Sequence, residues 1–141
     1  MVSMIRDEGR VLTQPDIPHA EPKMGKVAVI YTTPETVIED YARLLDLADY
    51  QTALTPDIDT FLKVNISWQH YYPACSTAPW QIEGVAEKLR ADGFDKLTAA
   101  HNGTVVVNPA EGREKNKHKV VEDRLGLGHI TLDVPPVKWV P

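Results

Sequence analysis

The feature that most constrains the fold of this chain is an apolar strand that leads, through a polar loop, into the start of a helix. Residues 60–65 predict the strand, which delivers Lys63 and Asn65 toward its carboxyl end. Residues 76–79 then combine two hydroxyl side chains with a proline, as the first turn of a helix commonly does. This order of elements is the layout of an α/β fold with a ligand site beyond the strand end.

The same succession of signals recurs along the chain. Residues 26–31 predict an earlier strand, and residues 32–35 predict the start of a helix that continues to Ala48. The helix that begins at residues 76–79 is expected to stop at Gly93. Further strands are expected at residues 96–100, 104–107 and 129–134, with a short helix within residues 111–124. We therefore expect an α/β fold, a mostly parallel sheet with helices packed on it as a two-layer or three-layer sandwich.

The chain divides into three parts by composition. Residues 1–25 contain three prolines and predict an extended arm with a short strand at residues 10–12. Residues 26–134 predict the α/β domain. Residues 135–141 form a proline-rich tail in which the apolar Trp139 has no element to pack on. We expect from this tail that the chain is truncated before a missing C-terminal half.

Charge and composition narrow the class of partner. Of the net charge of −5 over 141 residues, residues 1–60 hold 11 acids against 5 bases, whereas residues 61–141 hold 9 against 10. Neither nucleic acid nor a membrane is therefore expected as a partner, and an anion-binding surface is expected in the second part. The chain start has no signal-peptide stretch, and no apolar run reaches the ~20 residues that span a bilayer. We expect a cytoplasmic protein.

Metal and cluster chemistry find little support in the sequence. Cys75 is the single cysteine, so an internal disulfide and a four-cysteine zinc or iron–sulfur site within this chain are excluded. The histidines do not have metal-ligand spacing. We expect no metal site and no iron–sulfur cluster in this chain, and the identity of any other cofactor stays open.

The candidate site lies where the predicted strands end. Carboxyl ends of parallel strands meet at one edge of the sheet, and a helix start there offers free N–H groups to an anion. The expected ligand-binding residues are Lys63, Asn65, Ser67, Ser76, Thr77, His101 and Asn102. Lys63 would supply charge, and His101 has a pKa suited to proton transfer. The alternative is that these side chains only cap turns and the helix.

The loop from Trp68 to Tyr72 is a second point of interest. Its aromatic side chains favour a lid or a partner contact, or else they fold back on the core. Cys75 follows it as a weaker catalytic candidate beside His101. The basic stretch of residues 113–119 fits either an anion contact or, as the favoured interpretation, a solvated helix face.

Together these motifs resemble the family called domain of unknown function 362. The resemblance covers residues 26–134 and rests on short strings. They are Lys63-Val64-Asn65, residues 65–68, 72–77, 76–79 and 92–94, His101-Asn102 with residues 104–106, and Asn116-Lys117. It implies the N-terminal portion of a longer protein, without the Lys-Thr-His and Lys-Asn-Gly segments of the family's second half. Fusion of some members to ferredoxin-like modules hints at a redox-linked enzyme.

The sequence therefore predicts two alternative functions. The first is half of a binding site for a small anionic ligand in a redox-linked enzyme, with the other half in the missing part. The second is a non-catalytic interaction or oligomerisation module that uses the loop from Trp68 to Tyr72. Whether the chain catalyses a reaction stays open at this point.

Overall fold

The computed structural model describes residues 4–6, 10–12, 27–104 and 106–132. The two short strands β1 (Met4–Arg6) and β2 (Arg10–Leu12) pair antiparallel, so the strand expected at residues 10–12 is confirmed. The remainder of the predicted arm, and the tail of residues 135–141 with Trp139, lie outside the described residues.

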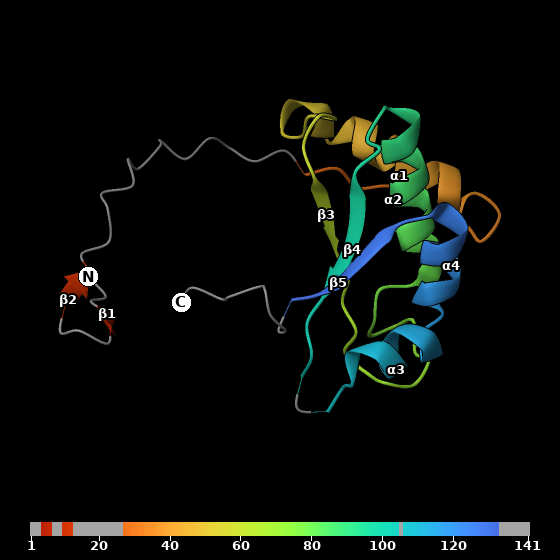
Figure 1. Ribbon diagram of the computed structural model, residues 1–141. Coiled ribbons are helices and arrows are strands. Elements are labelled where there is room, and N and C mark those ends of the chain that lie inside the picture. Colours follow the sequence, from red (N-terminus) through yellow and green to blue (C-terminus); the bar gives the residue numbers. More distant parts are fainter. Residues whose placement is uncertain (1–3, 7–9, 13–26, 105, 133–141) are drawn as a thin grey trace.

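The body of the protein is built on a three-stranded sheet in the order β3-β4-β5. Strands β3 (Thr60–Lys63), β4 (Leu97–His101) and β5 (Gly128–Thr131) are all parallel, with Lys63 opposite Ala100 and His101 opposite Thr131. Figure 1 shows the helices gathered to one side of these strands. The predicted α/β class with a parallel sheet is thus confirmed, and the described part has its two-layer form.

Four helices accompany the sheet in the part of the chain that the structure describes. Helix α1 (Val37–Leu47) precedes β3 and is followed by the 3₁₀ turn η1 (Tyr50–Thr52), and α2 (Pro79–Ala91) connects β3 to β4. Helices α3 (Pro109–Lys115) and α4 (His118–Leu125) connect β4 to β5. Parallel strands need such crossovers, because a tight turn cannot bring the chain back to the same end of the sheet.

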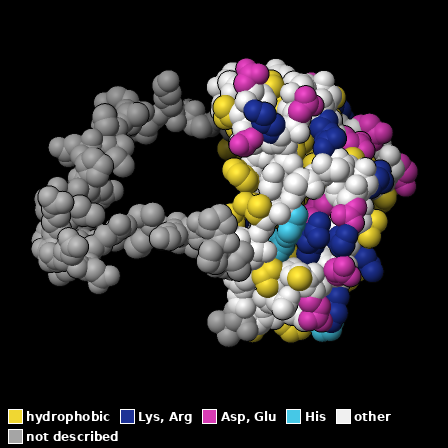
Figure 2. All heavy atoms as spheres, viewed as in Figure 1, with side chains coloured by type: hydrophobic (Ala, Val, Ile, Leu, Met, Phe, Trp, Pro, Cys, Tyr) yellow, Lys and Arg dark blue, Asp and Glu magenta, His cyan; other side chains and the backbone are white. Residues whose placement is uncertain are grey.

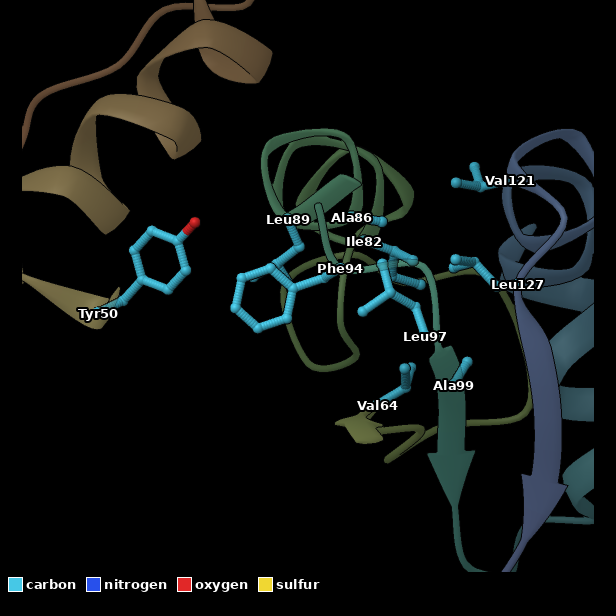
Figure 3. Close-up of a cluster of buried hydrophobic side chains, with 10 residues drawn as sticks. All are labelled: Tyr50, Val64, Ile82, Ala86, Leu89, Phe94, Leu97, Ala99, Val121 and Leu127. Carbon is cyan, nitrogen blue, oxygen red and sulfur yellow. The ribbon is translucent and has the colours of Figure 1, made fainter. Parts of the chain in front are cut away.

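The core lies between α2, α4 and the sheet. Figure 3 shows Ile82 and Leu89 of α2 on the side of the helix that faces Leu97 and Ala99 of β4, and Ala86 belongs to the same cluster. These five side chains are at most 4 % exposed. The rest of the cluster comes from other elements and consists of Tyr50, Val64, Phe94, Val121 and Leu127. The helical stripe expected on α2 is therefore confirmed as a buried surface.

Helix α2 begins at the expected residue but is capped differently. The residue before it is Ala78, whose side chain cannot accept a hydrogen bond. The Gln81 side chain instead accepts from the Ala78 N–H at 2.7 Å and donates to the Tyr41 hydroxyl at 2.7 Å. The Gln81 side chain thus provides the cap of α2. The hydroxyls of Ser76 and Thr77 instead accept hydrogen bonds from the backbone of the loop after β3.

The strand expected at residues 26–31 is wrong over its described part. Residues 27–33 have no regular secondary structure, and Val27, Val29 and Tyr31 are 83 %, 77 % and 98 % exposed. A strand needs a neighbouring strand to pair its backbone groups. No described strand pairs with this segment, so its apolar alternation alone does not produce one.

Two expectations in the second half also need correction. Thr104 and Val107 form an isolated antiparallel bridge with each other, so the chain reverses there within four residues and the strand expected at residues 104–107 is wrong. The charge-rich residues 111–124 contribute to two helices, separated at Lys117 with φ +66°. The last strand ends at Thr131, and residues 133–134 lie outside the described part.

Candidate functional site

Four of the predicted site residues meet after β3, and we call Asn65, Ser67, Ser76 and Thr77 the strand-end cluster. The Asn65 N–H donates to the Thr77 hydroxyl at 3.0 Å, and the Thr77 N–H donates to the Asn65 carbonyl at 2.9 Å. The Asn65 amide donates to the Ser67 hydroxyl at 2.6 Å, and the Ser67 N–H donates to Ser76 at 3.3 Å. These bonds close the long loop onto the start of α2.

The other predicted residues make local contacts. The Lys63 ammonium donates to the Val64 carbonyl at 2.9 Å, and the Asn102 amide donates to the Gly103 carbonyl at 3.2 Å. The Cys75 thiol lies 3.5 Å from the Tyr72 carbonyl. Within the described residues, no hydrogen bond joins Lys63, Asn102 or the Cys75 thiol to the strand-end cluster. Lys63 and Asn102 therefore lie at the ends of adjacent strands, but the predicted residues do not form one polar centre.

A separate group of titratable side chains lies between β4, β5 and the last two helices, and we call it the histidine cluster. It consists of His101, Arg113, Glu122 and His129. The rings of His101 and His129 lie 4.7 Å apart between centroids, at 48° between their planes. Oε2 of Glu122 lies 3.3 Å from Nδ1 of His129 and accepts from Nε of Arg113. Arg113 of α3 and His129 of β5 thus meet at the Glu122 carboxylate of α4, and His101 of β4 joins them through the ring of His129.

Burial sets the charge state of this cluster. His101 and Glu122 are each 1 % exposed. Burial, and then the neighbouring His129, lower the pKa of His101 to about 4, while Glu122 opposes the shift. Burial also lowers the pKa of His129, helped by Arg113 and opposed by Glu122. Both imidazoles are therefore neutral near pH 7, and Nε2 of His101 has no hydrogen-bond partner among the described residues.

The histidine cluster borders a cavity of about 500 Å³. The cavity lies beside α3 and the end of β5, and its lining residues are Ala110, Glu111, Arg113, Glu114, Lys115, His129 and Thr131. Figure 2 shows histidine, cationic and acidic side chains side by side on this part of the surface. Thr131 closes β5, so the cavity lies at the carboxyl edge of the sheet, where parallel sheets bind their ligands.

Sequence reasoning missed most of this cluster. His101 was expected, but Arg113 belongs to residues 113–119, interpreted as a solvated helix face, and Glu122 only to the short helix expected within residues 111–124. Arg113 is only 15 % exposed at its side chain, so that interpretation is wrong for it. A signal was available, because Asn108 and Pro109 predict a helix start and place Arg113 on the next turn.

His118 joins the two groups of residues. It is fully buried at the start of α4, and its Nε2 lies 2.6 Å from the Thr77 carbonyl. Burial lowers its pKa, while the Thr77 carbonyl and Glu122 oppose the shift. The neutral ring donates from Nε2 to this carbonyl and so ties the start of α2 to α4.

The large aromatic side chains of the loop are about half exposed. Trp68, Tyr71 and Tyr72 are 50 %, 48 % and 57 % exposed, so the alternative that they fold back on the core is wrong. The backbone of the loop is nevertheless anchored, because the Asn116 amide donates to the Trp68 carbonyl at 2.9 Å. Figure 1 shows the loop passing beside α3.

Comparison with known proteins finds no matching family model, no matching curated protein and no matching solved structure. The resemblance to domain of unknown function 362 therefore stays a prediction. Among the residues described, no group of three or more His, Cys, Asp or Glu side chains is arranged to hold a metal ion. No helix in the described ranges is long and apolar enough to cross a membrane.

Proposed function

We propose that this chain is an α/β domain that binds a small anionic ligand in the cavity beside the histidine cluster. The observation that carries the proposal is the convergence of His101, His129, Arg113 and Glu122 at the carboxyl edge of the parallel sheet. Perturbed titratable groups beside a cavity are typical of functional sites. The wider context we propose is that of a cytoplasmic, redox-linked enzyme in the domain of unknown function 362 family.

Two cations and two acids, Glu111 and Glu114, line this cavity, and we propose that the cations receive the anion. Lys115 and Arg113 both line it, and the Thr131 hydroxyl can add a directional hydrogen bond. Lys115 is held by Glu111 at 2.5 Å, and Arg113 by the buried Glu122. A ligand carboxylate or phosphate would replace Glu111 as the partner of Lys115. Arg113 would keep its buried partner and add charge to the wall of the cavity.

His129 is the group best placed to exchange a proton with the bound ligand. It lines the cavity, and it is neutral near pH 7 because burial lowers its pKa. A neutral imidazole can accept a proton from an acidic group in the cavity. Glu122, 3.3 Å from Nδ1, would then stabilise the imidazolium. Under this proposal His129 binds the ligand and serves as the base, and Glu122 positions it.

We propose that the strand-end cluster acts mainly by holding the loop after β3 in place. Its hydroxyls and amide bond to each other and to the backbone, which shapes the loop that follows β3. Ser67, Ser76, Thr77 and Asn65 remain candidates for ligand contact, together with Lys63 and Asn102. Their contribution is expected to be smaller than that of Lys115 and His129.

Calorimetric titration with inorganic phosphate tests the proposal. Wild-type protein should bind phosphate saturably, and Lys115→Ala should weaken binding by about tenfold, the equivalent of one lost charged contact. Lys119→Ala is the matched control, because Lys119 is equally exposed and paired with Asp123 but does not line the cavity. Absence of saturable binding, or equal losses in the two variants, would contradict the proposal.

A further inference from the structure

We infer that the loop after β3 forms a second binding site, which takes a planar heteroaromatic ring. A cavity of about 530 Å³ is lined there by Ser67, Trp68, His70, Tyr71, Tyr72 and Cys75. Of these residues only Ser67 was an expected ligand-binding residue and Cys75 a weaker catalytic candidate, and none lines the cavity beside the histidine cluster. The inference therefore does not depend on the proposed function.

The chemistry of the lining favours a flat, uncharged group. Three large aromatic side chains, Trp68, Tyr71 and Tyr72, are about half exposed. Among the described residues, the lining contains no Lys, Arg, Asp or Glu. Aromatic side chains stack on other rings in offset or edge-to-face arrangements, and a ring covered in this way loses its contact with water. A planar ring is thus the ligand that this surface recognises most directly.

The loop is pre-organised for such a ligand. The Asn116 side chain, 1 % exposed, donates both to the Trp68 carbonyl and to the Gly112 carbonyl, each at 2.9 Å. The Gln69 side chain accepts from the Asn108 N–H at 3.1 Å. The loop is therefore tied to both ends of α3. Fixing the backbone before binding reduces the entropy lost when a ligand binds.

A polar group in the cavity selects a heteroaromatic ring over a hydrocarbon one. The Ser67 hydroxyl accepts from the Asn65 amide at 2.6 Å, which orients the hydroxyl oxygen. Its proton can donate to a ring nitrogen or carbonyl. The volume lies within the range of about 300–1,000 Å³ typical of small-molecule sites. The aromatic lining, the Ser67 hydroxyl and the cavity volume together indicate a heteroaromatic small molecule as the ligand.

Adenosine is a suitable probe because it carries the ring without a phosphate. In calorimetric titration, adenosine should bind the full chain, and Trp68→Ala should weaken binding by about tenfold or more. The Asn116 contact reaches the backbone carbonyl of Trp68, so this variant keeps the anchor of the loop. Trp80→Phe, on α2 and outside this cavity, and Tyr71→Phe, which keeps its ring, should each bind within twofold of wild type.

The outcomes separate this inference from the anion site. Adenosine binding that is lost in Trp68→Ala while phosphate binding persists would support a separate ring site. No adenosine binding, with phosphate binding intact, would overturn the inference and leave the proposed function standing. Concentration-dependent sedimentation abolished by Trp68→Ala, without adenosine binding, would also overturn it and make the loop a self-association surface.

Discussion

At the scale of the residue, the arrangement depends on a few buried polar side chains with definite partners. Glu122 is 1 % exposed and accepts from Nε of Arg113, so its charge is paired inside the protein. Asp123 follows it on α4, is 56 % exposed and lies 3.7 Å from Nη2 of the same arginine. A buried carboxylate is strongly destabilising without its partner, whereas an exposed pair contributes little. The Arg113–Glu122 pair therefore fixes the position of α3 relative to α4.

The buried histidine His101 predicts a pH dependence of stability. Its pKa is lowered from 6.5 to about 4, so the unfolded chain binds the proton more readily than the folded protein. The resulting stability is complete above pH 6.5 and is lost as the pH falls toward 4. Between pH 7 and pH 5 the loss from this one group should be about 2 kcal/mol.

Urea unfolding at pH 7 and pH 5 measures this loss. In His101→Gln the difference in the free energy of unfolding between the two pH values should be smaller by about 2 kcal/mol than in wild type. His70→Gln provides the control, because His70 is exposed on the aromatic loop. An identical pH dependence in wild type and His101→Gln would show that His101 is not buried as a neutral ring.

At the scale of the element, the two long helices meet through a close backbone approach. A Cβ atom added at Gly84 of α2 would lie 2.7 Å from Cβ of Tyr41 and 3.1 Å from the Ile38 carbonyl oxygen of α1. Only glycine lets the two helices come this close. The Gln81 side chain reaches the Tyr41 hydroxyl at the same contact, so packing and capping depend on each other.

This contact predicts that a glycine-to-alanine substitution in α2 lowers the stability of the protein instead of raising it. In a free helix, replacing glycine by alanine stabilises by about 1 kcal/mol. Gly84→Ala should instead destabilise the protein by about 1–3 kcal/mol, because the methyl group overpacks the contact with Tyr41. Glu87→Ala, exposed on the same helix, should change the free energy of unfolding by less than about 0.5 kcal/mol. A gain in stability from Gly84→Ala would contradict the close approach of α1 and α2.

The sequence predicts elements well where one buried face defines the period. The stripe from Ile82 to Leu89 has helical spacing, and α2 is found with that face buried. Residues 27–31 have equally clear strand composition, yet a strand requires a partner that composition does not reveal. The break between α3 and α4 depends on the positive φ of Lys117. A positive φ is uncommon for residues other than glycine, so a lysine does not predict it.

At the scale of the whole molecule, the parallel sheet brings distant residues to one edge. Asn65, His101 and Thr131 follow or end three adjacent strands, as the topology rule anticipates. The sequence could therefore predict the edge on which a site lies. It could not predict that Glu122 and Arg113 reach that edge from the helix side. Their approach depends on how α3 and α4 pack, which no local pattern encodes.

A phosphate titration, followed through the imidazole nitrogen resonances of the histidines near pH 7, tests the anion site most directly. We expect saturable shifts at His129, which lines the cavity, with the exposed His70 unchanged. Lys115→Ala should move the titration to higher phosphate concentration. Saturable shifts confined to His70, or phosphate binding without any change at His129, would show that the anion site lies elsewhere.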